Sequence, residues 1–199
     1  MTDLMNRPHP DCPTDCPGTA ERGVDRHEPG TGERLNRLRA AVLGANDGIV
    51  STAAVVVGVA GATSDQTTIA MSGLAAVIGG AVSMALGEYV SVSSQRDSER
   101  AMGLAEEMQV NPWSAAIASF LSFLLGAALP FATALLAPAS WRIAAIFVLT
   151  LVALALTGAL SAKLGEAPVA RSVARIVVGG TMALAATFAI GSLFGANVG

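Results

Sequence analysis

Five long apolar runs occupy most of this 199-residue chain and restrict the folds open to it. Each run is near the length of about 20 apolar residues that a helix needs to cross the hydrocarbon core of a membrane. The runs are continuous and lack the apolar/polar alternation of barrel strands. The sequence therefore predicts an all-α integral membrane protein with five transmembrane helices, at about residues 38–61, 70–94, 113–136, 141–162 and 174–196.

The composition indicates the same class of protein. Hydrophobic residues make up 52% of the chain and charged residues 14%, whereas a soluble domain carries about 25% charged residues. The runs leave no room for a sizeable soluble domain, so residues 34–199 are predicted to form one transmembrane domain. Membrane lipid is its expected surrounding, and nucleic acid is not an expected partner.

Basic residues are concentrated on one side of the predicted membrane. Eleven of the twelve Lys and Arg residues lie before or at the start of the first run, after the second, or around the junction of the fourth and fifth. The eight that lie nearest to the runs are Arg34, Arg37, Arg39, Arg96, Arg100, Lys163, Arg171 and Arg175. The opposite side offers only Arg142. Because basic loops stay in the cytoplasm, the N-terminus is predicted to be cytoplasmic and the C-terminus external or luminal.

Residues 1–33 are predicted to be a disordered cytoplasmic tail, since residues 1–30 are rich in Pro, Gly and charge. The segment has no apolar h-region and so does not read as a cleaved signal peptide. It holds the histidines and cysteines of the chain: His9, Cys12, Cys16 and His27. Weak Zn²⁺ or Fe²⁺ binding there is an alternative, but the C-x₃-C spacing is not typical of a zinc site.

Two carboxylates interrupt the first two runs, at Asp47 and Glu88. Away from the ends of the five runs there is no other ionisable residue. A charged side chain in the hydrocarbon region costs about 2.5–3.5 kcal/mol even on lenient insertion scales, and such residues usually serve a function. These two carboxylates are therefore the first candidates for a functional site.

Helical rise places the two acids at a similar depth, together with a methionine. Asp47 lies ten residues beyond Arg37, which is roughly 15 Å into the membrane. The second run goes the opposite way, so Glu88 and Met84 lie roughly 12 Å and 18 Å from Arg96. Met84 and Glu88 are four residues apart and share one helix face. Asp47, Met84 and Glu88 are thus expected to converge.

This trio suits a borderline divalent transition metal, because it combines hard carboxylate oxygens with a soft thioether. Carboxylates also take up protons when a metal leaves, which gives a route to metal/proton exchange. The alternatives are ordinary packing for Met84 and a structural hydrogen bond for Asp47. Four nearby residues are candidate supporting partners, and the spacing does not select among them: Asn46, Ser51, Ser83 and Tyr89.

The segment after the second run carries further acids and methionines. Glu99, Met102 and Glu106 follow an i, i+3, i+7 spacing, which would place them on one face if the helix continues into the cytoplasm. Glu107 and Met108 lie beside Glu106. The group reads either as a vestibule that collects metal or as ordinary solvated surface.

Small residues and prolines complete the pattern. Gly44 and Gly48 form a GxxxG, and glycines recur at positions 73, 80 and 87. Such spacing predicts close helix packing in lipid, with room for an ion as the alternative. Asn111 and Pro112 are expected to begin the third helix, and Pro130 to kink it.

These blocks resemble a known family. The stretches LRAAVLGANDGIVSTAAVVVGVAGA and GAVSMALGEYVSVSSQRDSER are similar to the first two helices of vacuolar iron transporters, and NPWSAAIASFLSFLLGAALP is similar to their third. The similarity extends from Arg34 to the end of the chain.

The resemblance implies a homodimer of five-helix subunits that moves Fe²⁺, and often Mn²⁺, out of the cytosol in exchange for protons. The metal would be a transported substrate, with no permanently bound cofactor. The family's intramembrane pathway Asp falls on Asp47 and its pathway Met on Met84. Glu88 occupies a Gly-Glu-Tyr block that is common in the family, although some members lack its carboxylate.

One departure concerns the cytoplasmic side. Typical members insert a Glu-rich helical metal-binding domain between the second and third helices, whereas here this interval shrinks to about residues 96–111. The chain therefore resembles the short branch of the family. Glu99, Glu106 and Glu107 are then a remnant of a metal cluster at most.

The expected location is the plasma membrane if the source is bacterial, as the Ala- and Gly-rich composition suggests, and a vacuolar membrane if it is eukaryotic. Two other classes of function compete. In a non-transporting scaffold, Asp47 and Glu88 would only hydrogen-bond across the bundle. An intramembrane enzyme is disfavoured, because the runs contain no His, Cys or second Asp to form a catalytic group.

Overall fold

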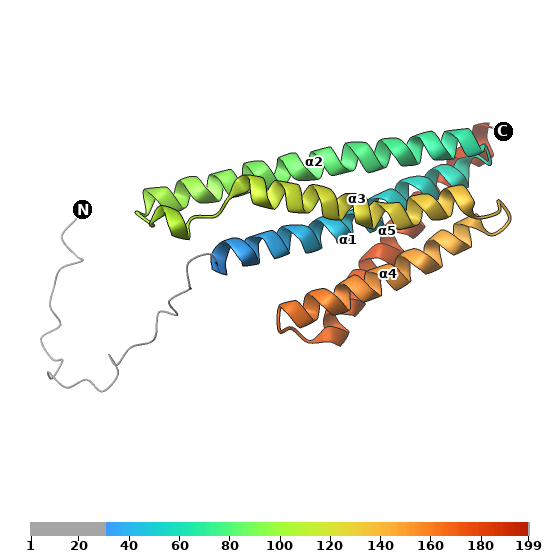
Figure 1. Cartoon of the computed structure of the whole chain (residues 1–199). Coiled ribbons are helices and arrows are strands. Elements are labelled where there is room, and N and C mark those ends of the chain that lie inside the picture. The colour runs from blue at the N-terminus through green and yellow to red at the C-terminus, as the bar shows by residue number, and fades with distance from the viewer. Residues whose placement is uncertain (1–30, 199) are drawn as a thin grey trace, which may run out of the picture.

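The computed structural model describes residues 31–198, which form five long helices and one short 3₁₀ turn (Figure 1). Each of the five predicted spans falls on one long helix, and all five are long and apolar enough to cross a membrane. The all-α, five-span prediction is thereby confirmed, while the orientation of the chain stays a prediction. The helices are α1 Thr31–Ala62, α2 Gln66–Ala101, α3 Pro112–Leu136, α4 Arg142–Leu164 and α5 Val169–Val198, with η1 Glu106–Met108 between α2 and α3.

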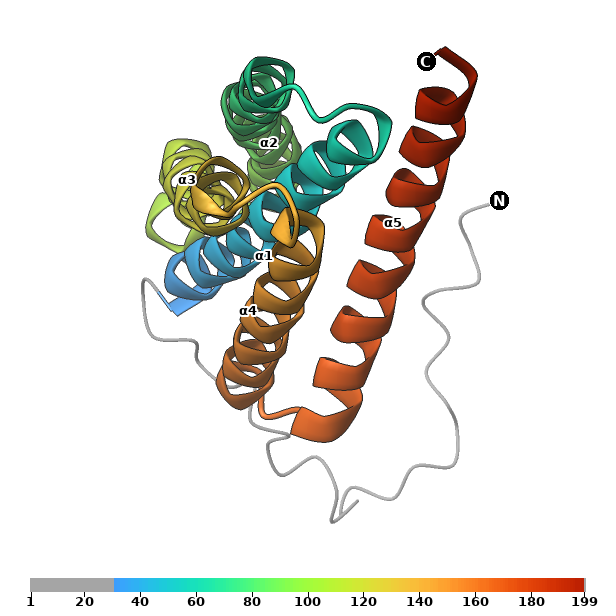
Figure 2. The same cartoon turned by 90° about the vertical axis from the view of Figure 1, so that its right-hand side faces the viewer.

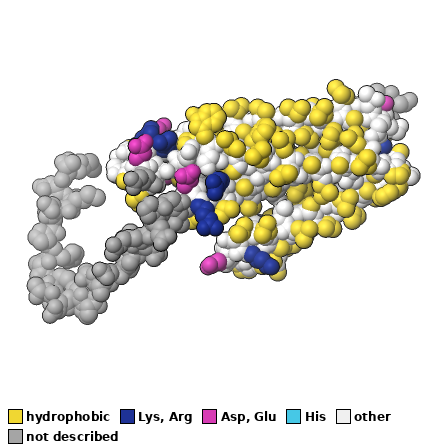
Figure 3. Space-filling model, in the orientation of Figure 1, with side chains coloured by type: hydrophobic (Ala, Val, Ile, Leu, Met, Phe, Trp, Pro, Cys, Tyr) yellow, Lys and Arg dark blue, Asp and Glu magenta, His cyan; other side chains and the backbone are white. Residues whose placement is uncertain are grey.

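The predicted tail, with His9, Cys12, Cys16 and His27, lies outside the described residues. Hydrophobic side chains cover the length of the helices in Figure 3, and most of the visible charged side chains gather at the end where α1 begins and α2 ends. An apolar flank between charged ends is the surface that a bilayer requires.

Helix α1 lies at the centre of the bundle and packs against all four other long helices. Figure 2 shows α2 and α3 on one side of it and α4 and α5 on the other. The contact of α1 with α3 is the most extensive of the bundle. This central position brings the polar residues of α1 next to those of α2.

Glycines bring α1 and α3 into backbone contact. A side-chain carbon added at Gly48 would overlap the carbonyl oxygen of Phe123, and one added at Gly126 would overlap that of Ala45. Gly44 meets the backbone of Ser119 in the same way. The predicted packing role of the GxxxG is confirmed, because small residues are what allow such close approach in lipid.

The glycines of α2 divide into two groups. Gly73 and Gly80 lie against the rings of Phe131 and Phe123, so they too have a packing role. Gly87 has open space where a side chain would be. It lies on a part of α2 that no other element of the described chain covers closely.

Side chains cap the helices where the chain turns. Asp65 accepts bonds from the backbone N–H and the hydroxyl of Thr68, at 2.7 and 2.6 Å, and these bonds hold the pKa of Asp65 below its ordinary value. Asn111 accepts from the backbone N–H groups of Trp113 and Ser114 at the start of α3. The predicted start of the third helix is thereby confirmed. Pro130 is buried inside α3, which continues past it to its end.

The end of α2 differs from the expectation. The helix continues two turns past residue 94 but stops at Ala101, with Gly103 at a φ of 76°. Glycine adopts this left-handed conformation readily, so it ends the helix at little cost. Met102 is therefore the cap of α2, and Glu106 begins a separate 3₁₀ turn. The expectation that Glu99, Met102 and Glu106 share a face of one continuing helix was wrong.

Candidate functional site

An open groove of about 390 Å³ lies between α1 and α2. Asp47 reaches it from α1, and Met84 and Glu88 reach it from α2. The convergence of these three residues, predicted from depth alone, is therefore found in the structure. Their roles in transport are a separate question.

Helical spacing explains which residues line the groove. Four residues of α1 recur at intervals of four and so form one stripe along the helix: Arg39, Leu43, Asp47 and Ser51. The α2 wall carries mainly small residues around Met84 and Glu88, namely Gly80, Ser83, Gly87 and Ser91. Because small side chains fill little space, the groove is hollow beside both carboxylates.

Asp47 is half-buried, and one of its two oxygens is occupied. The Ser51 hydroxyl donates to Oδ1 of Asp47 at 2.8 Å. Ser51 lies one turn further along α1. Of the four candidate partners that the sequence offered, it is the one that bonds Asp47. The other oxygen, Oδ2, accepts no hydrogen bond from residues 31–198 and is available to a cation in the groove.

Glu88 is buried, with 5% of its side chain exposed, and it is paired with an arginine. Nη2 of Arg39 donates to Oε2 of Glu88 at 3.1 Å, and the same nitrogen lies 3.1 Å from Oδ1 of Asn36. The Arg39 side chain is itself 53% exposed. A buried acid is therefore neutralised by a cation that stands at the rim of the groove.

Arg39 was predicted only as one of the cytoplasmic flanking charges, and its pairing with Glu88 was not predicted. A signal was present, because Arg39 lies two steps of four residues before Asp47, on the stripe along α1 that also holds Leu43. The partner on α2 was harder to find, since the two residues are 49 positions apart.

Met84 has two environments. It lines the groove, and it also packs on the buried cluster of Ala81, Phe123 and Ala127. Its side chain therefore borders the groove while it packs against residues of α3. The packing alternative and the ligand hypothesis are both compatible with this position.

The remaining candidate partners lie in different places. Ser83 lines the groove, whereas Tyr89 packs against Trp113 of α3 with ring centroids 4.8 Å apart. Asn46 lines a second cavity of about 430 Å³ between α1, α4 and α5, and its Oδ1 has no hydrogen-bond partner. Ser51 and Ser83 are thus the ones that lie beside the two acids.

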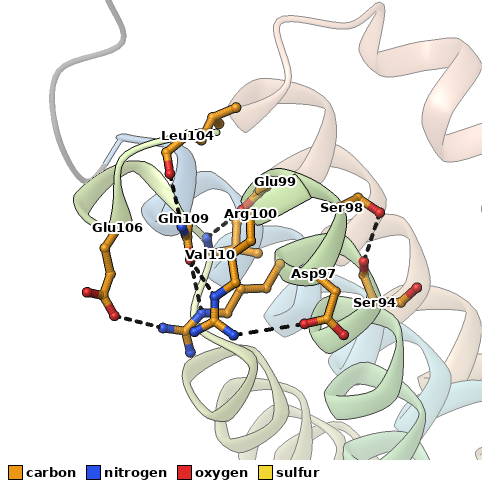
Figure 4. A network of polar contacts seen from close by, with 10 residues as sticks. Ser94, Asp97, Ser98, Glu99, Arg100, Leu104, Glu106, Gln109 and Val110 are labelled. Carbon is orange, nitrogen blue, oxygen red and sulfur yellow. Dashed lines mark hydrogen bonds and ion pairs between the residues drawn. The ribbon is translucent and has the colours of Figure 1, made fainter. Parts of the chain in front are cut away.

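The acids in the last turn of α2 and beyond it are used in local contacts (Figure 4). Glu99 accepts from the backbone N–H of Val110 at 3.0 Å and from the side chain of Gln95 at 2.9 Å. Glu106 forms an exposed ion pair with Arg96 at 3.6 Å. These bonds brace the connection between α2 and α3.

Gln109 completes this brace by accepting from Arg96 and Arg100 and donating to the carbonyl of Leu104. Met102 is exposed, and the Glu107 side chain lies outside the described part of the structure. Across residues 31–198, no three His, Cys, Asp or Glu side chains come together as a metal cluster. That Glu99, Met102, Glu106 and Glu107 collect metal on the cytoplasmic side stays a prediction.

A second arginine network lies at the opposite end of the bundle, where α3 ends and α4 begins. Arg142 is 8% exposed and donates to the carbonyl of Ala137 at 3.4 Å and to the side-chain oxygen of Gln66. Gln66 in turn donates to the carbonyls of Ala134 and Leu135, each at 3.4 Å. This network ties α2, α3 and α4 together through neutral acceptors only.

Comparison with known proteins gives a consistent result. A family model described as the VIT family matches residues 38–110 and 100–192. Vacuolar iron transporter homolog 5 of Oryza sativa subsp. japonica is 44% identical over 173 residues, which cover 82% of this chain and 83% of that protein. Vacuolar iron transporter homolog 1 of Arabidopsis thaliana is also 44% identical over 173 residues, with 83% and 86% covered. The matches include both walls of the groove.

Proposed function

The chain belongs to the VIT family, and on this premise we propose that it carries Fe²⁺ or Mn²⁺ out of the cytoplasm, along the groove between α1 and α2, in exchange for protons. As a member of a family of iron transporters, it is a transporter homologue and not an enzyme. The observation that carries the proposal is the meeting of Asp47, Met84 and Glu88 in one groove of an otherwise apolar bundle.

The donor set fits the proposed cargo. Two carboxylates and a thioether suit a borderline transition metal better than Mg²⁺ or Ca²⁺, which prefer oxygen ligands alone. Asp47 supplies a free oxygen, and Met84 supplies the sulfur from the opposite wall. An open groove that offers few ligands also suits a carrier, because a transported ion must bind well enough to enter and weakly enough to leave.

Asp47 is the residue that would couple metal to protons. Its carboxylate holds either a cation or a proton, and a charged residue within the membrane cannot stay unpaired at low cost. Loss of the metal on one side therefore favours uptake of a proton before the site returns. The Ser51 hydroxyl donates to Oδ1 of Asp47 and holds the carboxylate in the groove.

The proposal includes a homodimer. Gly79 and Gly87 of α2 have open space where a side chain would be, and Leu86 and Val90 beside them are exposed. A surface of small and apolar residues allows a second helix to approach closely in lipid. A second copy at this face would border the groove and reduce its exposure to lipid.

The remaining expectations belong to the same proposal. The N-terminus lies in the cytoplasm, so metal enters at the end where Arg39 stands. The membrane is a plasma membrane if the source is a bacterium, and a vacuolar membrane, the one that the names of the relatives give, if it is a eukaryote.

Uptake by proteoliposomes tests the proposal. Full-length protein is reconstituted with a divalent-sensitive dye inside, and Fe²⁺ and Mn²⁺ are each supplied outside, with and without an acidic lumen. We expect uptake that accelerates with the proton gradient and that falls by at least about tenfold in Asp47→Ala, equivalent to a loss of about 1.4 kcal/mol. Asp65→Asn is the matched control, since it removes a carboxylate outside the groove and keeps the cap of α2.

The same experiment examines the scaffold alternative. Asp47→Asn preserves hydrogen bonding with Ser51 but removes the charge, so a scaffold survives this change and metal/proton exchange does not. Normal uptake by Asp47→Asn would reject the mechanism. A lack of uptake by folded wild-type protein would reject transport of these metals.

A further inference from the structure

The Arg39–Glu88 pair has an unusual asymmetry. Glu88 is 5% exposed and cannot leave the groove, whereas the Arg39 side chain is 53% exposed. The bond between them, 3.1 Å from Nη2 to Oε2, lies among the residues that line the groove. One partner is enclosed, and the other borders both this groove and the cavity between α1, α4 and α5.

A second acceptor is already in place for the arginine. Nη2 of Arg39 also lies 3.1 Å from Oδ1 of Asn36, which is 8% exposed and one turn earlier on α1. Asn36 is neutral, so it attracts the guanidinium less than a carboxylate does. The guanidinium that leaves Glu88 therefore keeps one hydrogen bond and stays close to the groove.

Charge decides what can replace Arg39 at Glu88. Coulomb attraction scales with the charge of the cation, so a divalent ion is attracted about twice as strongly as the guanidinium at the same distance. A monovalent ion offers no such advantage and lacks the tether that keeps Arg39 near its partner. Asp47, by contrast, has no arginine partner among residues 31–198, and its Oδ2 accepts no hydrogen bond from them.

We propose that Arg39 is a tethered cation that occupies Glu88 while the groove holds no metal, and that it makes Glu88 accessible to divalent but not to monovalent cations. Arg39 thereby sets the charge selectivity of the pathway without being a metal ligand. The proposal rests on the proposed function, in which Glu88 belongs to that pathway.

Metal binding by purified full-length protein tests this proposal, with Mn²⁺ as the probe because it resists oxidation. Wild type, Arg39→Gln, Glu88→Gln and the double variant are titrated by calorimetry. Removing the competitor should tighten Mn²⁺ binding about tenfold in Arg39→Gln, given the usual strength of charge-assisted hydrogen bonds discounted for exposure. The gain should vanish in the Glu88→Gln background.

Arg37→Gln is the matched control. It removes the same charge from the same helix, but Arg37 is exposed and lies nearly opposite Arg39 around α1. We expect less than about a twofold change in Mn²⁺ affinity, since only the long-range field is altered. An equal gain in Arg37→Gln would overturn the proposal in favour of general surface electrostatics.

Competition with K⁺ tests the selectivity directly. Mn²⁺ affinity is measured in KCl and in choline chloride at equal ionic strength, because choline is too large to compete within the groove. Wild type should give the same affinity in both salts, whereas Arg39→Gln should bind Mn²⁺ more weakly in KCl. Equal Mn²⁺ affinities of Arg39→Gln in KCl and in choline chloride would contradict the proposal that Arg39 excludes monovalent cations.

Asn36→Ala keeps the proposal testable if Arg39→Gln does not fold. It removes the second acceptor, so Arg39 should stay on Glu88 and Mn²⁺ binding should weaken by about two- to threefold, the effect of a shared neutral hydrogen bond. Unchanged or tighter binding would overturn the proposal.

The failures of the two proposals are distinguishable. Binding that needs Asp47 but ignores Arg39 would reject only the role of Arg39. Wild-type protein that is folded and binds no Mn²⁺ would reject the metal pathway and this inference with it.

Discussion

The two ends of the bundle each hold an arginine that lies close to neighbouring helices, but the two arginines are bound in opposite ways. Arg39 is half exposed and bonds a buried carboxylate beside the groove. Arg142 is 8% exposed and bonds a backbone carbonyl and an amide oxygen, with no acid among its partners in the described chain. The difference separates an exchangeable contact from a permanent one.

The physical reason lies in the acceptors. The carbonyl of Ala137 belongs to the cap at the end of α3, where the helix dipole provides partial negative charge. Arg142 therefore donates to a carbonyl at the end of a helix, and the partial negative charge there stabilises the guanidinium. Because Arg142 is buried, a cation from solution cannot take its place. Glu88, in contrast, offers a full charge at the wall of an open groove, which any cation of sufficient charge can use.

The largest effect on stability is expected for Arg142→Ala. The change removes two bonds of a buried cation and leaves Oε1 of Gln66 and the carbonyl of Ala137 without their donor, at a cost of about 3 kcal/mol in the free energy of unfolding. Thermal unfolding in detergent measures this loss as a fall in Tm. Mn²⁺ affinity of the folded fraction should stay at the wild-type value.

Gln66→Leu provides the control for this prediction. Because Gln66 and Arg142 share a bond, their effects on stability should not add in the double variant. Full additivity would show that the two side chains act independently. A shift in Mn²⁺ affinity as large as that of Arg39→Gln would remove the contrast between the two ends.

A smaller loss of stability is expected for Arg39→Gln than for Arg142→Ala, because about half of the Arg39 side chain is exposed and an exposed partner contributes less to an ion pair. Glu88 also lines the open groove, where a cation from solution can take the place of the guanidinium. Tm measured beside that of Arg142→Ala ranks the two ends directly. An equal fall in Tm would mean that both arginines are structural and would contradict the assignment of an exchangeable role to Arg39.

The smallest effect is expected for Glu106→Gln, which breaks the ion pair with Arg96. The Glu106 side chain is 81% exposed, so the free energy of unfolding should change by less than about 0.5 kcal/mol. Uptake at limiting Mn²⁺ should also be unchanged, because the charges that matter lie in the groove. A severalfold fall in uptake would instead support the predicted metal-collecting vestibule.

The sequence was sufficient for the features that depend on local or one-dimensional patterns. The five spans follow from run length alone, and the start of α3 follows from Asn111 and Pro112. The common depth of Asp47, Met84 and Glu88 follows from helical rise counted from the flanking arginines. Depth is set by position along a helix, which the sequence records directly.

Contacts that depend on how helices face each other were not predictable in the same way. In lipid, most positions of a helix are apolar, so no polar face marks the direction of its neighbours. The bond between Arg39 and Glu88 needs the relative rotation of α1 and α2, and the buried position of Arg142 needs the meeting of three helices. The early end of α2 was missed because its cause, Gly103, takes a left-handed turn that the acidic spacing does not reveal.

The close contact of α1 with α3 bears on how the groove can change shape during a transport cycle. Gly48 and Gly126 meet backbone atoms of the facing helix, which leave no space for sliding or rolling. Gly73 and Gly80 of α2 meet the rings of Phe131 and Phe123 instead, and rings can reorient. The wall that carries Asp47 is therefore held by contacts between backbones, whereas the wall that carries Met84 and Glu88 is held by contacts between backbone and side chains. On the proposed function, we expect alternating access to move α2 relative to α3 more readily than α1 relative to α3, because side chains can reorient where backbones cannot.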